Sequence, residues 1–147
     1  MIGMDFKSAK AAFFDRKAVM SKVDAATRKV LSKFGAFVRR SAKSSIRKRK
    51  KPAPPGSPPS SHTGLLKKFI FFGYDPAPGR GSVVIGPTRL SQKGRGEAPP
   101  LLEYGGKATL VRRGKKKRTT YKARPYMGPA FEKEKPQLPA MWRDSIR

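Results

Sequence analysis

The chain has 147 residues and no cysteine, and its 35 lysine and arginine residues against 9 acidic residues give a net charge of +26. These counts exclude disulfide scaffolds and cysteine-ligated metal sites within the chain, and its single histidine cannot build a multi-histidine site. We therefore expect no metal and no organic cofactor. The charge predicts a partner of opposite sign, either nucleic acid or acidic neighbours in an assembly. Because no apolar run approaches the roughly 18–20 residues of a membrane-spanning helix, we expect no contact with a membrane.

Residues 18–49 are predicted to form one long basic helix, preceded by a lead-in segment over 1–17 with a short helix at 5–16. Apolar residues recur at steps of three and four, which is the pattern of one buried helical stripe. A helix of this length measures about 45 Å at about 1.5 Å per residue. Because that is long for a small domain, we expect part of the stripe to meet a neighbouring subunit. The stripe residues predicted for the core are Val23, Val30, Phe34, Phe37 and Val38.

Residues 50–63 are predicted to be a proline-rich strap, because five prolines fall within 52–59. Proline has no amide donor and a fixed φ, so this segment cannot continue the helix and is expected to be extended. We interpret the strap as a stiff connector, and the alternative is a recognition motif for domains with aromatic grooves.

Residues 64–125 are predicted to contain antiparallel strands. Two strands at 67–74 and 82–86 are expected to pair across a proline- and glycine-containing turn. Two more are expected at 108–112 and 118–123, on either side of a very basic tip. The residues expected in the core here are Phe69, Phe71, Val84, Leu101 and Leu102.

Residues 126–147 are predicted to form a C-terminal helix that is broken at Pro129, Pro136 and Pro139. The whole order predicts a single α+β domain. A long N-terminal helix packs on a small antiparallel β-sheet, and the C-terminal helix completes the fold.

His62 is the obvious candidate for acid–base chemistry, since an unperturbed imidazole titrates near neutral pH. It has no partner evident from the sequence, whereas nucleophilic catalysis needs a base that is held by a third group. Glu132 and Glu134 alternate with lysines, which is typical of a solvated helix face. The chain also lacks a glycine-rich phosphate loop. We therefore expect no enzymatic activity, and an enzyme such as a nuclease is the least favoured of the hypotheses considered below.

Two basic runs are the strongest functional signal. One lies at the C-terminal end of the long helix, where cations interact favourably with the helix dipole, and the other lies in the loop 106–120. Because this many charged side chains cannot be buried without partners, each run is expected to face water, an acidic partner or nucleic acid. Tyr121 and Tyr126 lie near enough in the sequence to stack on bases. The residues predicted to contact DNA or to dock partners are Arg39, Arg40, Lys43, Arg47, Lys48, Arg49, Lys50, Lys51, Arg112, Arg113, Lys115, Lys116, Lys117 and Arg118.

Three segments in chain order carry a family resemblance. The first is the basic helix and strap followed by PPSSHTGLLKKFI at 58–70, and the second is VVIGP at 83–87 followed by PLLEYGG at 100–106. The third and most specific is ARPYMGPAF at 123–131. Together they resemble the head–tail joining, or tail-completion, proteins of tailed bacteriophages, also described as neck proteins or minor tail components. The motif residues are Thr63, Gly64, Leu65, Glu103, Tyr104, Gly105, Arg124, Pro125, Tyr126 and Pro129.

The resemblance implies a structural virion protein without catalytic activity. It implies a homo-oligomeric ring, six- or twelve-fold, that forms or completes the head–tail interface and passes the genome through its lumen. The implied partners are the portal, adaptor or head-closure protein, the tail terminator or tail-tube proteins, and genomic DNA bound without sequence specificity. Assembly would occur in the cytoplasm of the host bacterium, and the protein would reside in the neck or tail of the virion. We also expect Arg124 to be paired and Pro125 to fix the start of the last helix.

The basic insert at 106–120 is long for this family and leaves open whether the phage is long-tailed or short-tailed. The alternative function is a basic nucleic-acid-binding protein associated with the ribosome or the nucleoid. That alternative predicts tight binding with a steep dependence on salt. The joining hypothesis predicts weak, sequence-blind binding to DNA and specific binding to other virion rings.

Overall fold

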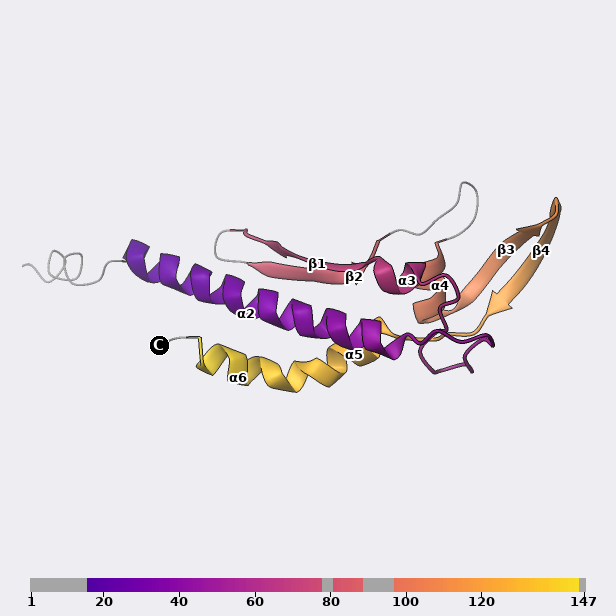
Figure 1. The fold of residues 1–147 in the computed structure, drawn as a ribbon. Helices are drawn as coiled ribbons and strands as arrows, with labels where there is room; N and C mark the ends of the chain where they lie inside the picture. The colour runs from indigo at the N-terminus through magenta and orange to yellow at the C-terminus, as the bar shows by residue number, and fades with distance from the viewer. Residues whose placement is uncertain (1–15, 78–80, 89–96, 146–147) are drawn as a thin grey trace, which may run out of the picture.

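The computed structural model describes residues 16–77, 81–88 and 97–145, and its fold is α+β, as the sequence predicts. Apart from Arg16 and Lys17, which belong to the long helix, the lead-in segment lies outside the described residues. A long helix is covered on one side by a β-hairpin and on the other by two short helices, and a second hairpin projects from one end (Figure 1). The elements in chain order are α2 (Arg16–Ser45), α3 (Leu65–Lys68), β1 (Ile70–Asp75), β2 (Ser82–Pro87), α4 (Ala98–Tyr104), β3 (Gly106–Arg112), β4 (Lys115–Tyr121), α5 (Met127–Glu134), η1 (Lys135–Gln137) and α6 (Leu138–Arg143).

The helix α2 is the scaffold on which the other elements pack. Its residues Val30, Phe34, Val38 and Ala42 follow one another at steps of four and are buried, which confirms the predicted stripe over this part of the helix. Val23 belongs to the same stripe but is 52% exposed, so its predicted place in the core is wrong. The reason is that the N-terminal end of α2 extends past both layers that cover the rest of the helix (Figure 1).

The helix ends at Ser45, four residues before the predicted boundary. The hydroxyl of Ser44 donates a hydrogen bond to the carbonyl of Ser41 (2.9 Å), and that of Ser45 donates to the carbonyl of Ala42 (2.8 Å). Serine side chains that bind nearby carbonyls in this way compete with helical hydrogen bonding. The chain then buries Ile46 in the core and passes into the strap.

The strands β1 and β2 form an antiparallel hairpin that packs on α2. Phe72 and Val83 approach the helix at Gly35, where a Cβ would lie only 2.9 Å from either side chain. The absence of a side chain at Gly35 therefore allows the sheet and the helix to come this close. Ile70, at the start of β1, is fully buried in the same interface.

The outer face of this hairpin contradicts two core predictions. Phe71 is 46% exposed and Val84 is 69% exposed. Successive side chains of a strand point to opposite faces, and the face that carries these two is turned away from α2. Phe69, Leu101 and Leu102 are half-buried.

The four strands form two separate two-stranded sheets and not a single sheet. In the second hairpin Arg112 lies opposite Lys115, and Arg113 and Gly114 form the turn with φ values of 49° and 76°. Two consecutive positive φ values define the type I′ turn, whose twist suits a two-residue hairpin connection. The β3–β4 hairpin points away from the layers around α2 (Figure 1).

The C-terminal helix is broken into α5, η1 and α6. Pro136 and Pro139 lie at the starts of η1 and α6, and Pro129 lies in the first turn of α5. In the first turn of α5 an amide has no intrahelical acceptor, so Pro129 costs no hydrogen bond, and the predicted break there is wrong. Pro136 and Pro139 follow backbone that is already helical, so their missing amides interrupt the hydrogen bonding where the helix type changes. Phe131 of α5 meets Phe34 edge-on, with ring centroids 5.6 Å apart. The core consists of Phe34, Val38, Ala42, Ile46, Leu66, Ile70, Tyr126 and Ala130.

Candidate partner and nucleic-acid interface

The carboxylate of Glu103 connects α4 to the start of α5. Its Oε2 accepts hydrogen bonds from the backbone amides of Tyr126 (2.9 Å) and Met127 (3.1 Å), and its Oε1 accepts one from Gly128 (2.8 Å). These amides belong to the first turn of α5 or directly precede it, where backbone donors have no helical acceptor. A negative charge at this end of a helix also interacts favourably with the helix dipole. Glu103 therefore caps α5 from a different element, and it connects the second and third motif segments.

Arg124 connects the proline-rich strap to the segment that Glu103 caps. Its Nε donates to the carbonyl of Ala53 in the strap (2.8 Å), and its backbone amide donates to the carbonyl of Leu102 (2.6 Å). The amide of Gly56 donates in turn to the carbonyl of Ala123 (2.9 Å). Arg124 is thus paired as expected, although its partner is a backbone carbonyl. We call this meeting of the strap, the end of α4 and residues 123–128 the junction.

A glycine allows the close packing of the junction. Gly105 has a φ of 74°, and a Cβ there would lie 2.9 Å from the amide nitrogen of Ala123 and from the carbonyl oxygen of Tyr121. Any larger residue would clash with backbone and not with a movable side chain. The motif glycine at this position therefore serves the junction directly.

Tyr126 lies inside the junction and is 1% exposed. Its hydroxyl has no hydrogen-bond partner among the described residues. Burial raises the pKa of this phenol, and the nearby charge of Glu103 raises it further. Tyr126 cannot stack on a nucleic-acid base as its sequence position suggested, because a packed core surrounds the ring.

The other motif residues lie around α3 and α5. Gly64 has a φ of 77° at the start of α3, and its amide donates to the hydroxyl of Ser61 (2.9 Å). Thr63 and Leu65 are exposed beside it. Pro129 is exposed in α5, and Pro125 is half-buried just before that helix, where its fixed φ was expected to set the entry angle.

The cations in the last two turns of α2 are held by the fold. Arg39 donates from Nε to the carbonyl of Ile70 (2.8 Å), and its guanidinium lies 6.0 Å from the centroid of the Phe71 ring. Arg40 lies 5.5 Å from the ring centroid of Phe37. Such contacts fix the direction of the side chains and leave other guanidinium donors available.

Lys43 belongs to a denser group of cations on the same helix. Partial burial lowers the pKa of its ammonium group, and the positive charges of Arg39 and Lys67 lower it further. Sequence analysis did not name Lys67, because nothing in its position predicts that α3 brings it near α2.

The cations that follow α2 are exposed. The carbonyl of Arg47 accepts a hydrogen bond from the amide of Ser61 (3.1 Å), which holds the strap beside this basic segment. The exposed cations of the segment are Arg47, Lys48, Arg49, Lys50 and Lys51.

The β3–β4 hairpin carries cations on both faces. Lys115 and Lys117 occupy one face of β4, and Lys116 and Arg118 occupy the other, since neighbouring residues of a strand alternate. All four are exposed, as is Arg113 in the turn, and residues 106–121 contain no acidic residue. A two-stranded hairpin is only marginally stable alone, and like charges across strands destabilise it further. A partner that supplies negative charge would therefore stabilise this element.

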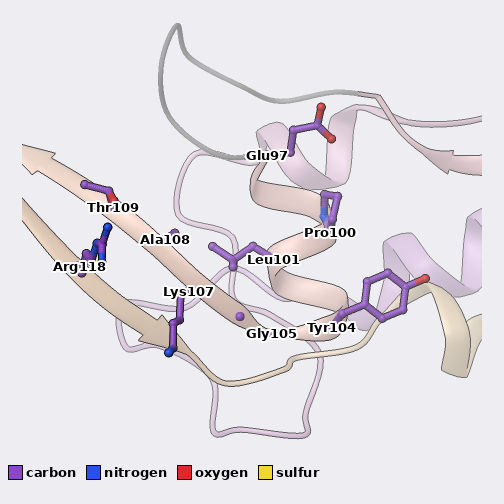
Figure 2. A pocket seen from close by; sticks show the side chains of 10 residues that line it. Glu97, Pro100, Leu101, Tyr104, Gly105, Lys107, Ala108, Thr109 and Arg118 are labelled. Carbon is purple, nitrogen blue, oxygen red and sulfur yellow. The ribbon is translucent and has the colours of Figure 1, made fainter.

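An open cleft of about 710 Å³ separates the hairpin from α4. Leu101 and Tyr104 line it from the side of α4, and Lys107, Thr109 and Arg118 line it from the strands (Figure 2). Tyr104 is 82% exposed. Tyr104 is thus the exposed aromatic residue of the cleft lining, and its ring points away from Lys107 and Arg118 (Figure 2). Tyr121, one of the two tyrosines that sequence position suggested, is half-buried.

Candidate catalytic groups are not brought together. His62 is exposed, and the described part of the chain holds no group of three or more histidine, cysteine or acidic side chains placed to bind a metal ion. Glu134 is not on a solvated face: it is 7% exposed and accepts hydrogen bonds from Ser41 Oγ and from Gln137 Nε2 (2.9 Å). It therefore links α5 to α2.

Among the residues that the structure describes, no helix has the length and apolar character to cross a membrane.

Comparison of the chain with protein-family models, with curated proteins and with solved structures finds no match. The functional argument therefore depends on the residues and the geometry described above.

Proposed function

We propose that this chain is a structural subunit of the head–tail interface of a tailed bacteriophage, where it forms or completes a ring of six or twelve copies around the path of the genome. It acts by docking and oligomerisation, without catalysis. Its neighbours are the portal, adaptor or head-closure protein on one side and the tail terminator or tail-tube proteins on the other. The observation that carries the proposal is the junction, in which segments from all three parts of the sequence resemblance meet.

The junction gives the motif residues a physical reason to occur together. Glu103 caps α5, Arg124 ties the strap to that site, and Gly105 lets the backbones approach. All of these contacts lie within the chain, so their effect is to fix the base of the β3–β4 hairpin. A fixed base holds the exposed cations in one direction, as a docking element requires.

The charge of the hairpin defines the chemistry of what it contacts. Between 106 and 121 the described side chains include no acid and six exposed cations, namely Lys107, Arg113, Lys115, Lys116, Lys117 and Arg118. The hairpin therefore fits an acidic face of a neighbouring ring or the phosphates of DNA in the lumen. Contacts of this kind do not read base sequence.

A second candidate function is nucleic-acid binding outside a virion. The observation that favours it is the cleft whose lining includes both Tyr104, which is 82% exposed, and the cations Lys107 and Arg118. Proteins that bind single-stranded nucleic acid combine an exposed aromatic ring with a basic groove in this manner. The two candidates differ in whether the essential partner is a protein ring or a nucleic acid.

The assembly of particles tests the proposal. In the hairpin variant, serine replaces Arg113 and the four cations from 115 to 118, which leaves the turn glycine in place. We expect tailless heads and free tails to accumulate, because the docking element has lost its charge. A control variant removes five exposed cations elsewhere, namely Arg16, Lys17, Lys133, Lys135 and Arg143, and we expect it to give complete particles. Complete, infectious particles with the hairpin variant would contradict the docking role.

A further inference from the structure

The N-terminal third of α2 forms an apolar groove with α6 that the core does not use. The groove has a volume of about 550 Å³. Val19, Val23 and Ala26 line it from α2, and Trp142 lines it from α6. Val19 is 43% exposed and Val23 is 52% exposed. This end of α2 extends past both the β1–β2 hairpin and α6 (Figure 1).

The charged residues in the lining of the groove are positive. Lys22 and Lys29 belong to its lining, which contains no acidic residue among the described side chains. They are seven residues apart, so they lie on the same side of α2, about 10.5 Å apart along the axis at about 1.5 Å per residue. Asp24 lines a different hollow with Arg16 and Lys17. The groove therefore combines an apolar floor with one cationic wall.

We propose that this groove binds an acidic amphipathic helix of another protein. The apolar face of that helix would cover Val19, Val23 and Trp142, and carboxylates two turns apart would face Lys22 and Lys29. This is the helix-in-groove mode of recognition, in which apolar anchors supply affinity and flanking charges supply orientation.

The charges disfavour a second copy of this chain as the occupant. Residues 16–29 carry five cations and one acid, so pairing two such helices would bring like charges together. The inference goes beyond the proposed function and does not depend on it, because the groove lies on α2 and α6 and not at the junction or the β3–β4 hairpin.

Trp142 provides a direct readout, because it is the single tryptophan of the chain and it lines the groove. The experiment titrates the full chain with a designed amphipathic peptide of about 18 residues. The peptide carries leucines on one face and glutamates beside them, and it lacks tryptophan and tyrosine. A matched peptide replaces each glutamate with lysine. We expect a saturable blue shift of the Trp142 emission with the acidic peptide and none with the basic one.

Two charge variants refine the test. In Lys22→Glu combined with Lys29→Glu, we expect the affinity for the acidic peptide to fall about tenfold or more, with binding of the basic peptide appearing. The control is Lys17→Glu combined with Lys51→Glu, which makes the same change in net charge at exposed positions outside the groove lining. We expect it to bind like the parent chain, and circular dichroism verifies that both variants stay folded.

Four results would overturn the inference. Equal binding of the two peptides would show a merely apolar surface. The absence of any shift would show that the groove does not accept a helix of this chemistry. A blue emission already present in the free monomer would show that the chain covers the groove itself. A second copy would be identified as the occupant by a blue shift that grows with protein concentration in the absence of peptide. Sedimentation would then show dimerisation, and Val23→Asp would abolish both the shift and the dimer.

Discussion

Glu103 joins two elements that are distant in the sequence through three hydrogen bonds to backbone amides, each between 2.8 and 3.1 Å. Its two carboxylate oxygens satisfy donors that the helix itself leaves without acceptors. Replacing Glu103 by alanine would therefore leave backbone groups unsatisfied and would also remove a negative charge from the start of α5.

We predict that Glu103→Ala lowers the free energy of unfolding by roughly 2–4 kcal/mol, which combines a lost helix cap with lost charge-assisted hydrogen bonds. Urea unfolding followed by circular dichroism measures the change. Glu132→Ala is the matched control, because Glu132 forms an exposed pair with Lys135 at 3.5 Å, with side chains 66% and 59% exposed. Such a pair contributes less than about 1 kcal/mol. Equal effects of the two substitutions would contradict the capping role.

Tyr126 predicts a dependence of stability on high pH. Burial raises the pKa of its phenol above the ordinary value near 10, so above that pH the unfolded chain loses this proton while the folded chain keeps it. The folded state then binds more protons than the unfolded state, and stability falls as the pH rises.

We expect Tyr126→Phe to lose less stability than the parent chain between about pH 9 and pH 11, since it lacks this ionisation. At neutral pH we expect it to be at least as stable as the parent, because it removes a buried hydroxyl that has no partner. Unfolding by urea at several pH values measures both effects. Tyr104→Phe changes the same group at an exposed site, and a pH profile that it alters as much would refute this assignment.

The roles of single residues at the junction were only partly predictable. The sequence motif singled out Glu103, Gly105, Arg124 and Tyr126, but not the contacts that they make. A carboxylate that caps a helix from another element leaves no local pattern, because its acceptors and donors are separated by more than twenty residues. Tyr126 was misassigned for a related reason: nearness to cations in the sequence does not indicate whether a ring is buried.

At the scale of elements, the interface between α2 and the β1–β2 hairpin depends on Gly35. A glycine in the middle of a helix normally costs stability, so Gly→Ala at an exposed site stabilises by about 1 kcal/mol. Here the added Cβ would lie 2.9 Å from Phe72 and from Val83.

We predict that Gly35→Ala destabilises the protein by roughly 1–3 kcal/mol, because overpacking outweighs the gain in helix propensity. Thermal or urea unfolding measures the sign directly. Ala25→Gly, at an exposed position of the same helix, isolates the propensity effect and should cost about 1 kcal/mol. A Gly35→Ala variant that is more stable than the parent would contradict the close packing described here.

Local sequence patterns predict the presence of a helix or strand more reliably than they predict which of its faces is buried. The long helix, the two hairpins and the broken C-terminal helix each leave a local signal in periodicity or in proline and glycine. Phe71 and Val84 are as apolar as buried strand residues, and only the placement of α2 determines which face of the hairpin is covered. The split into two sheets likewise depends on tertiary packing, because a sequence pattern predicts strands but not which hairpins join.

At the scale of the whole molecule, α2 separates two surfaces of different character. The junction and the cationic β3–β4 hairpin lie toward its C-terminal end, and the apolar groove with α6 lies toward its N-terminal end (Figure 1). The expectation that part of α2 meets a neighbouring subunit remains a prediction, and the occupant that we propose for the groove is a helix of another protein.

The dependence of DNA binding on salt distinguishes the two candidate functions. If nucleic acid is the essential partner and the five cations that the hairpin variant removes each neutralise a phosphate, their loss should make the slope of log K against log salt shallower by about 0.9 per contact for duplex DNA. The joining function predicts weak binding with little preference among sequences. Fluorescence anisotropy with duplex and single-stranded oligonucleotides, for the parent chain and the hairpin variant, measures this. Tight, steeply salt-dependent binding that the hairpin variant abolishes would favour the nucleic-acid candidate.

The copy number of this chain in purified virions tests the central claim most directly. Quantitative mass spectrometry against the portal protein of the same particles supplies the ratio. Our account predicts a number that corresponds to one ring, about six or twelve copies per particle, as closed cyclic assemblies require. Absence of the chain from particles that are complete and infectious would contradict its role at the head–tail interface.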